Sequence, residues 1–391
     1  MADAGAASAA ELEPAPPSET LAGLFLRFLR FGALAWGGPV AQIAMIRQEL
    51  VEEERWISPA RFNRVLAVYQ VLPGPEAHEL CVYFGARARG RVGGLLAGLG
   101  FMLPGFVLMF ALSVAYVRFD LRASALAAAF AGCQPAVVAL IVRAVHRIGS
   151  HALHERWLLG IALAAALATL AGASFALVLP LAGIAYVIAR GGAHSTAHGV
   201  AFVPLIAGAA PAAGALAPSV LALFITGLRS GLLTFGGAYT VIPFLRADAV
   251  GAGGWMSDAQ FLDGLALSGI LPAPLVIFST FVGYLGGGAA GALAVTAGVF
   301  LPAFAFTLVG HQWVERIVEQ RRTHAFLDGV TAGVVGLIAV TALQLARSTL
   351  TSWPALAIFA AALLAAFRWK ARTAVVWIVA GAALAGAILS R

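Results

Sequence analysis

Apolar stretches follow one another along almost the whole chain after residue 21, and this feature constrains the fold most. The chain is 61% hydrophobic and 11% charged, with a mean hydropathy of +0.91, whereas soluble domains carry about 25% charged residues. These values exclude a soluble globular enzyme and predict an all-α polytopic membrane protein. Thirteen stretches lie near 22–46, 60–86, 93–117, 123–147, 157–171, 175–190, 200–217, 220–246, 259–286, 291–313, 325–346, 354–367 and 374–389.

The charge and the cysteine content limit which partners and cofactors we expect the chain to bind. The net charge is +7, although the first twenty residues are acidic and contain no Lys or Arg. Residues 1–21 therefore predict a disordered acidic tail, and the missing basic start and apolar run exclude a signal peptide. No basic block stands outside the apolar stretches, so nucleic acid is not expected, and lipid head groups and cytoplasmic loops account for most of the charge. Cys81 and Cys133 lack CxxC or paired-His spacing, so neither a metal site nor a cofactor is expected.

Four of the apolar stretches contain helix-breaking residues. The breaks are Gly37-Gly38-Pro39, Pro73-Gly74-Pro75, Gly236-Gly237 and Pro272-Ala273-Pro274. Proline removes a backbone donor, and glycine lowers helix stability by about 1 kcal/mol relative to alanine. Unpaired backbone at membrane depth persists only inside protein or beside a water-filled cavity. The sequence therefore predicts four discontinuous helices.

The breaks belong to an internal repeat. The pair Gly37-Gly38 matches Gly236-Gly237 at an offset of 199, and the same offset relates Trp56 to Trp255 and the two proline pairs to each other. After a slip of one residue, Leu103-Pro104 matches Leu301-Pro302. The predicted organisation is a first transmembrane half at 22–190, a linker at 191–219 with a connecting helix, and a second half at 220–391.

Loop charge predicts that the second half is inverted. Each half has six apolar elements, and a single connecting element then turns the second half upside down. Arginines crowd the loop at 87–91 and charges fill 314–324, whereas the counterpart loops at 286–290 and 118–122 carry fewer. Positive loops prefer the cytoplasm, so we expect an inverted-topology repeat with a cytoplasmic N-terminus and a C-terminus on the opposite side. Arg143 and Arg147 also count here as cytoplasmic charge.

An inverted repeat with broken helices is typical of secondary transporters, whose sites lie near the midplane. Each half-helix N-terminus presents free N–H groups and a partial positive charge, which suits an anion. The alternative is that the breaks only kink helices for packing. The predicted substrate-binding residues are Gly37, Gly38, Pro73, Gly74, Pro75, Gly236, Gly237, Pro272 and Pro274, together with Asn63, Arg64 and Gln70.

Ionisable residues follow the Pro-Gly-Pro break. Glu76 and Glu79 stand in the first turn of the next helix with His78 between them. Such carboxylates can simply stabilise the helix dipole, but charged groups at membrane depth are expensive and usually functional. We therefore expect Glu76 or Glu79 to carry a coupling proton, with His78 as a further candidate.

Other polar residues have expected structural roles. Asp263 occupies the repeat position of Arg64, and the two are candidates for a salt bridge between the halves. Trp56 and Trp255, each followed two residues later by serine, predict an interfacial belt and helix N-caps. The run Glu52-Glu53-Glu54 predicts a solvated turn.

These motifs resemble the chromate ion transporter family, whose long members contain two such halves. The first half carries Phe31 to Pro39 (FGALAWGGP), Gln70 to Glu79 (QVLPGPEAHE), Cys81 to Gly85 (CVYFG), Gly90 to Gly94 (GRVGG) and Leu103-Pro104. The second half repeats them as Thr234 to Gly237, Trp255-Met256-Ser257 and Leu271 to Pro274 (LPAP). Because its Pro-Ala-Pro lacks the following acidic and His residues, we expect the halves to differ in function.

The resemblance implies a secondary active transporter that exports chromate and confers chromate resistance, located in the cell (inner) membrane. A carrier of sulfate or a related oxyanion, in uptake or exchange, is the first alternative. An intramembrane enzyme is the second, although neither HExxH nor Gly-x-Ser-x-Gly is present. The expected partners are chromate, its analogue sulfate and the lipid bilayer. The sequence leaves open whether the protein forms a homo-oligomer and which ion is coupled to transport. It also leaves open whether the broken elements cross the membrane or re-enter.

Overall fold

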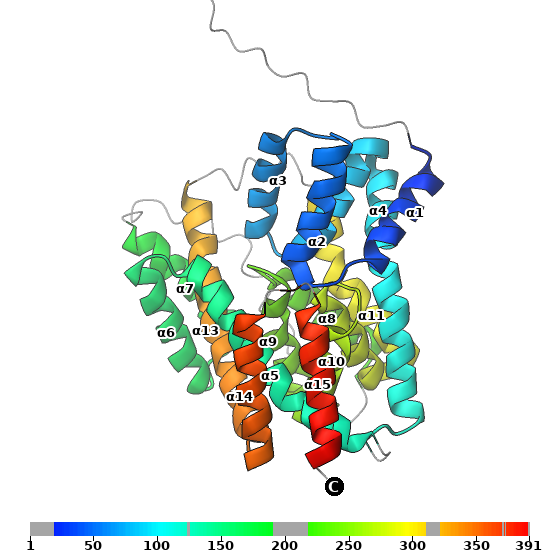
Figure 1. The fold of residues 1–391 in the computed structure, drawn as a ribbon. Helices are drawn as coiled ribbons and strands as arrows, with labels where there is room; N and C mark the ends of the chain where they lie inside the picture. The colour runs from blue at the N-terminus through cyan, green and yellow to red at the C-terminus, as the bar shows by residue number, and fades with distance from the viewer. Residues whose placement is uncertain are drawn as a thin grey trace, which may run out of the picture.

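The computed structural model describes residues 19–122, 126–190, 218–309, 321–369, 371 and 373–389, and within these ranges all regular structure is helical. Residues 1–18 of the predicted tail, the connecting element near 200–217 and most of the 314–324 loop lie outside the described residues. Helix α1 (Leu21–Ala33) begins at one end of the bundle, and α15 (Ala374–Leu389) finishes at the other (Figure 1).

The first half opens with two helical hairpins separated at the predicted breaks. Helix α1 is followed by α2 (Gly38–Arg47) and the π-helix η1 (Gln48–Glu53), and α3 (Pro59–Val71) is followed by α4 (Glu76–Arg118). Arg27, near the start of α1, pairs at 3.1 Å with Glu49, just beyond the end of α2. Each broken element therefore starts and ends at the same end of the molecule, as Figure 1 also shows for α3 and the start of α4. We call such an element a re-entrant hairpin.

A tight turn divides α4 into two antiparallel parts. The backbone leaves helical geometry at Arg89 and Gly90, and Gly90 has a φ of 61°. The two parts touch closely, because a Cβ on Gly85 would lie 2.5 Å from the carbonyl oxygen of Gly93. The predicted loop at 87–91 is thus only a turn between the half-helix 76–88 and the long helix 91–118. We call this end of the molecule the Arg89 end.

The second half repeats this order. Its elements are α8 (Val220–Leu232), η3 (Ala238–Thr240), α9 (Val241–Arg246), the π-helix η4 (Ala247–Ala252), α10 (Asp258–Gly269), η5 (Leu275–Phe278) and α11 (Ser279–Leu308). A second tight turn at Gly287 and Gly288 divides α11 as Arg89 and Gly90 divide α4. An ion pair between Arg229 and Asp248 ties α8 to η4, as Arg30 and Glu49 tie α1 to η1.

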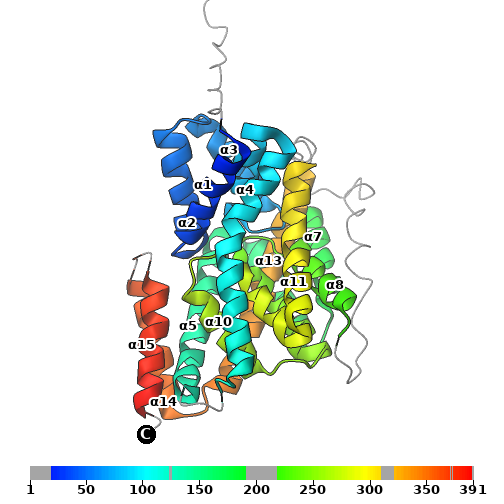
Figure 2. The ribbon, with the colours of Figure 1, turned by 90° about the vertical axis from the view of Figure 1, so that its right-hand side faces the viewer.

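The two halves are inverted with respect to each other. The long parts of α4 and α11 run antiparallel, because Gly94 faces the side chain of Leu308 and Gly98 faces that of Phe304. Figure 2 shows these helices side by side, with α8 at the opposite level from α1. The predicted fold class, two homologous halves in inverted topology with discontinuous helices, is confirmed.

Among the remaining helices, two hairpins each pack against a long helix of the other half. The remaining helices are α5 (Ala127–Ala152), α6 (Arg156–Leu170), α7 (Phe175–Ala189), α13 (Arg321–Thr349), α14 (Trp353–Arg368) and α15. The α6–α7 hairpin packs on α13, where Gly336 meets the backbone of Ala162, and α14–α15 packs on α5, where Gly132 meets Gly386. A side chain at either glycine would push the helices apart. The hairpin of the first half thus covers α13 of the second half, and α14–α15 of the second half covers α5 of the first.

Four helical segments of the described chain are long and apolar enough to cross a membrane, and they correspond to the four full-length spans predicted from the sequence. They contain residues 76–118, 127–152, 275–308 and 323–349. Helices α6 and α7 have only 15 residues each, which reach about 22 Å. The molecule is therefore a multi-pass membrane protein with shorter hairpins beside its main spans.

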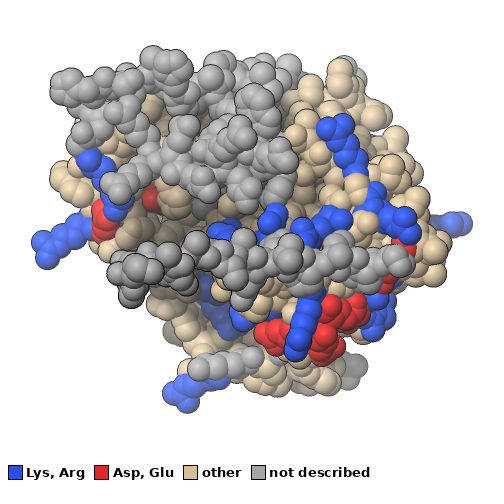
Figure 3. All heavy atoms as spheres, turned by 90° about the horizontal axis from the view of Figure 1, so that it is seen from above, with Lys and Arg blue, Asp and Glu red and all other residues tan. Residues whose placement is uncertain are grey.

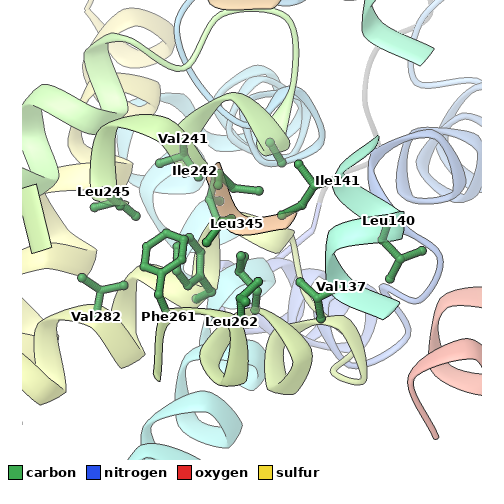
Figure 4. Close-up of a cluster of buried hydrophobic side chains, with 14 of the residues drawn as sticks. Val137, Leu140, Ile141, Val241, Ile242, Leu245, Phe261, Leu262, Val282 and Leu345 are labelled. Atoms are coloured by element: carbon green, nitrogen blue, oxygen red, sulfur yellow. The ribbon is translucent and has the colours of Figure 1, made fainter. Parts of the chain in front are cut away.

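The core contains two large clusters of buried apolar side chains, one within the first half between residues 24 and 101 and one that spans both halves. Figure 4 shows Val241, Ile242 and Leu245 of α9 meeting Phe261 and Leu262 of α10. Val137 and Ile141 of α5 complete this cluster from the first half. Burying such side chains stabilises the fold by about 1.5–3 kcal/mol each, so the second half's re-entrant hairpins are firmly packed around apolar side chains.

Three expectations about polar residues need correction or are confirmed here. Trp56 is fully buried inside the protein and so does not face lipid as an interfacial belt requires, and its indole N–H donates to Glu54 at 2.8 Å. Glu54 also pairs with Arg27 at 2.6 Å, so the acidic run is not simply a solvated turn. Figure 3 shows acidic and basic side chains adjoining each other at this end. Ser58 and Ser257 are confirmed as N-caps, each accepting a backbone N–H at 3.2 Å.

Candidate functional site

The four breaks meet in pairs in the middle of the molecule. The backbone N–H of Gly74 donates to the carbonyl oxygen of Thr234 at 3.0 Å, which joins the second break of one half to the first break of the other. The opposite pairing, Gly37-Gly38 with Leu271 to Leu275, surrounds a cavity. Irregular backbone is therefore gathered at the interface of the halves, as expected for a transporter site.

The cavity has a volume of about 430 Å³ and opens between α2, α5, the end of α10 and the start of α15. One wall consists of Trp36, Gly37, Gly38 and the first turn of α2. Tyr239, Ser268 and Leu271 come from the second half. A tetrahedral oxyanion with hydration water fits this space, since ligand pockets commonly measure about 300–1,000 Å³.

The Gly37-Gly38 wall supplies backbone donors. Gly37 and Gly38 have φ values of 91° and 77°, a region that other residues enter only with strain. A Cβ on Gly38 would meet no atom within 4 Å, so its surroundings are open rather than filled by packing. Helix α2 begins here, and the N–H groups of Gly38 and Val40 in its first turn have no partner within the helix, while Pro39 has no N–H. The break at Gly37-Gly38 lies where the sequence predicts it, and anion binding at this break stays a prediction.

Two arginines of α5 complete the positive wall. Arg143 and Arg147 are four residues apart and so share one face of the helix, and both line the cavity. Among the described residues neither guanidinium has a carboxylate at ion-pair distance. The loop-charge argument counts both arginines as cytoplasmic charge and misses their position in the cavity wall. The signal was available, because paired arginines within an apolar spanning helix usually mark an ion pathway.

The predicted coupling residues lie behind this cavity. Glu76 is largely buried at the start of its half-helix and interacts electrostatically with Arg147. His78 and Glu79 are completely buried. Neither carboxylate oxygen of Glu79 has a hydrogen-bond partner in the described chain. Of these three residues, only Glu76 stands close to the charges of the cavity wall.

Aromatic rings and a glycine surround the two buried residues. The imidazole of His78 packs against Phe300 and Phe304 of the second half, with ring centroids 5.0 and 4.7 Å away. The carboxylate of Glu79 lies directly beneath Gly74, where a Cβ would come within 2.9 Å of Oε1. A side chain at Gly74 would therefore displace Glu79, so this break and the buried carboxylate depend on each other.

The other predicted site residues lie elsewhere. Asn63, Arg64 and Gln70 are exposed on α3 and do not line the cavity. Gly236 packs near Thr331 of α13 instead of facing the cavity. None of the predicted prolines lines the cavity: Pro73 and Pro75 lie between α3 and α4, and Pro272 and Pro274 lie between α10 and η5. Leu271, Ala273 and Leu275, beside the second pair, do line it. Gly237 precedes η3 and is not part of the wall.

The expected salt bridge between Arg64 and Asp263 is wrong. Asp263 is fully buried and accepts hydrogen bonds from Tyr116 at 2.7 Å and from Gln134 at 3.0 Å. Its ionic partner is Arg122, at 3.5 Å. The halves are inverted, so equivalent positions such as 64 and 263 lie on hairpins that enter from opposite ends.

Comparison with known proteins identifies relatives along the whole chain. A family model described as chromate transporter matches residues 22–190 and 221–387. A chromate transport protein of Pseudomonas aeruginosa is 56% identical over 97% of this chain and 95% of its own length. The chromate transport protein of Cupriavidus metallidurans is 32% identical over 95% of this chain and 94% of its own. A probable chromate transport protein of Synechococcus elongatus is 31% identical over 95% of this chain and 96% of its own. No solved structure matches the chain.

Proposed function

The chain belongs to the chromate transporter family, and from its geometry we propose that it is a secondary active transporter that exports chromate from the cytoplasm and so confers chromate resistance. Its relatives are named transport proteins, which supports a transporter rather than an enzyme. One observation carries the proposal. The cavity between the halves combines a helix N-terminus with two arginines that lack carboxylate partners in the described chain.

Chromate is a tetrahedral dianion, and this cavity offers it two kinds of donor. The first-turn N–H groups of α2 bind oxygen atoms at the positive end of the helix. The guanidinium groups of Arg143 and Arg147 add planar, bidentate donors. The cavity is positive but only partly enclosed, which lets the ion enter and leave.

Alternating access would come from motion of one half against the other. We propose that residues 22–190 and 220–391 move as the two transmembrane halves, pivoting where the breaks meet at Gly74 and Thr234. Rocking of this kind around a fixed central site is common to inverted-repeat transporters. The re-entrant hairpins then supply opposite walls of one pathway.

The membrane potential supplies a driving force in the proposed orientation. With the Arg89 end in the cytoplasm of the cell (inner) membrane, the N-terminus is inside and the C-terminus outside, as the loop charge predicts. Moving two negative charges outward across about 100 mV of inside-negative potential releases about 4.6 kcal/mol. ATP is not the direct energy source, because the sequence contains no Walker motif.

Glu76 is the proposed proton-coupling residue. It competes with the anion for Arg147, so a bound dianion leaves the Glu76 carboxylate without its cation. Uptake of a proton by Glu76 would then accompany substrate binding. Glu79 and His78 lie deeper along the same half-helix and would pass or store that proton.

The direct experiment is chromate flux through the purified protein in proteoliposomes with imposed voltage and pH gradients. The proposal expects flux that rises as the side with the Arg89 end is made negative. Sulfate that competes in the same vesicles, without any chromate flux, would favour the sulfate carrier instead. Flux that ignores voltage and pH would contradict secondary active export.

A further inference from the structure

A second polar cluster lies away from the cavity, around Asp263 of α10. Its side chain is fully buried, and its partners come from three other segments: Tyr116 near the end of α4, Gln134 of α5 and Arg122 of the chain between them. Burying a carboxylate in a membrane protein is costly unless it is paired, and such groups usually mark a pathway. Neither the cavity nor the proposed proton residues account for this one.

The cluster lies between the cavity and the end opposite to Arg89. Ser268 and Gly269, at the end of α10, line the cavity, and Asp263 is five residues earlier, about 8 Å along the helix. On α5, Gln134 precedes Arg147 by thirteen residues, or about 20 Å. The cluster is therefore nearer than the cavity to the far end of the molecule, which we call the Arg122 end.

The contacts join parts that must separate if the halves move. Asp263 belongs to a re-entrant hairpin of the second half, whereas Tyr116, Gln134 and Arg122 belong to the first. The side chain of Arg122 is 40% exposed, while that of Asp263 is not exposed at all. Arg122 is thus the partner able to move, and Tyr116 and Gln134 hold the carboxylate in place. The nearby charges are Asp120 and the exposed Arg118.

We propose that Arg122 and Asp263 form a gate that closes the pathway at the Arg122 end and that the departing oxyanion opens it. A dianion reaching this point competes with the carboxylate for the guanidinium group, because both are bidentate oxygen acceptors. Arg122 then swings away with the anion, and Asp263 keeps its hydrogen bonds to Tyr116 and Gln134. The proposal rests on anion transport through the cavity, but the gate itself can be tested without it.

A native thiol reports on the gate. Cys133 is buried beside Gln134 and interacts electrostatically with Asp263. In a Cys81→Ala background it is the single cysteine of the chain. The experiment measures the alkylation rate of Cys133 in vesicles, using a small membrane-impermeant thiol reagent added at the Arg122 end.

The gate predicts that Arg122→Gln raises this rate by about tenfold or more, since it removes a charge-assisted contact. Arg122→Lys should stay near the original rate. Arg118→Gln is the matched control, since it removes an exposed arginine from the same end, and it should have no effect. Chromate, added to the protein with Arg122 intact, should raise the rate.

Two results would overturn the gate. One is an unchanged alkylation rate in Arg122→Gln, and the other is an equal rise in Arg118→Gln, which would indicate general loosening. If Arg122→Gln does not fold, Asp263→Asn replaces it, since it removes the charge but keeps acceptors for Tyr116. Absence of chromate flux with a raised alkylation rate would refute the proposed function and leave the gate standing.

Discussion

The two halves share one architecture but differ in the charged residues that they place near the centre of the molecule. In the first half, the helix that follows the second break starts with Glu76 and contains a buried His78 and Glu79, whereas the matching segment of the second half is the apolar Leu275–Phe278. Helix α5 places Arg143 and Arg147 in a cavity. Its counterpart α13 has no basic residue between His324 and Arg347. Among the described residues, the charged side chains of the cavity wall therefore come from the first half, and the second half completes the wall with uncharged residues.

This difference shows that the halves of an inverted repeat can share a backbone arrangement and still differ in their charged residues. Matched breaks, π-helices and tight turns are needed twice, because both halves must build a re-entrant pair of hairpins. The charges that line the cavity are needed only once, because the proposed pathway runs between the halves. Each additional buried charge would cost several kcal/mol without serving the ion.

The largest expected effect comes from removing the arginines that only the first half has. The double variant Arg143→Gln, Arg147→Gln should lower chromate flux in proteoliposomes by about 100-fold or more, because hydrogen bonds to charged groups contribute about 1.5–3 kcal/mol each. Arg156→Gln, which changes an exposed arginine at the start of α6, should leave flux unchanged. Normal flux in the double variant would place the anion elsewhere.

Substitutions of equivalent glycines test the comparison directly. Gly38→Ala and Gly237→Ala both force alanine into positive φ with no clash within 4 Å, at a cost of about 1–2 kcal/mol each. Their thermal stabilities should fall alike. Only Gly38→Ala should also lower flux, by about tenfold, because it moves donors that face the cavity. Equal flux losses would mean that the halves contribute equally.

Glu76→Gln should alter how flux depends on pH. The substitution keeps the size of the side chain but removes its proton, so the pH dependence should flatten while protein levels stay normal. The measurement is chromate flux across a series of pH values at fixed voltage. A profile that keeps its shape would remove Glu76 from the coupling mechanism and leave voltage as the driving force.

The smallest effect concerns a surface difference between the halves. Arg190 and Tyr186 of the α6–α7 hairpin donate to Glu155, and these hydrogen bonds lower the pKa of that carboxyl. A lowered folded-state pKa means that the stabilisation is present above the ordinary pKa and is lost as pH falls through the lowered one. Arg190→Gln should therefore reduce the thermal midpoint slightly at pH 7 and by less at pH 3. Equal reductions at both values would assign the loss to packing.

Much of the fold follows from the sequence, because breaks and repeats are local. Pro73 to Pro75 and Gly37-Gly38 interrupt helices for reasons contained in their own backbones, and all four breaks lie where they were predicted. The inversion followed from loop charge, which depends on the membrane and not on packing. Re-entry of the hairpins stayed open, because hydropathy alone cannot show where a chain turns back.

The site was harder to predict, because it depends on which faces meet. Arg143 and Arg147 are separated from Gly37 by a hundred residues, and only tertiary packing brings them to one cavity. Conversely, Arg64 was chosen for its place in a broken element, but its face of α3 points away from the cavity wall. Burial of Trp56 by Glu54 and Arg27 likewise arises from contacts between segments.

Equilibrium binding of chromate to the purified protein tests the central claim most directly. The protein with Arg143 and Arg147 should bind one chromate ion, and the double glutamine variant, folded and equally stable, should bind it about 100-fold more weakly or not at all. If both proteins bind chromate with the same affinity, the cavity between the halves is not the anion site.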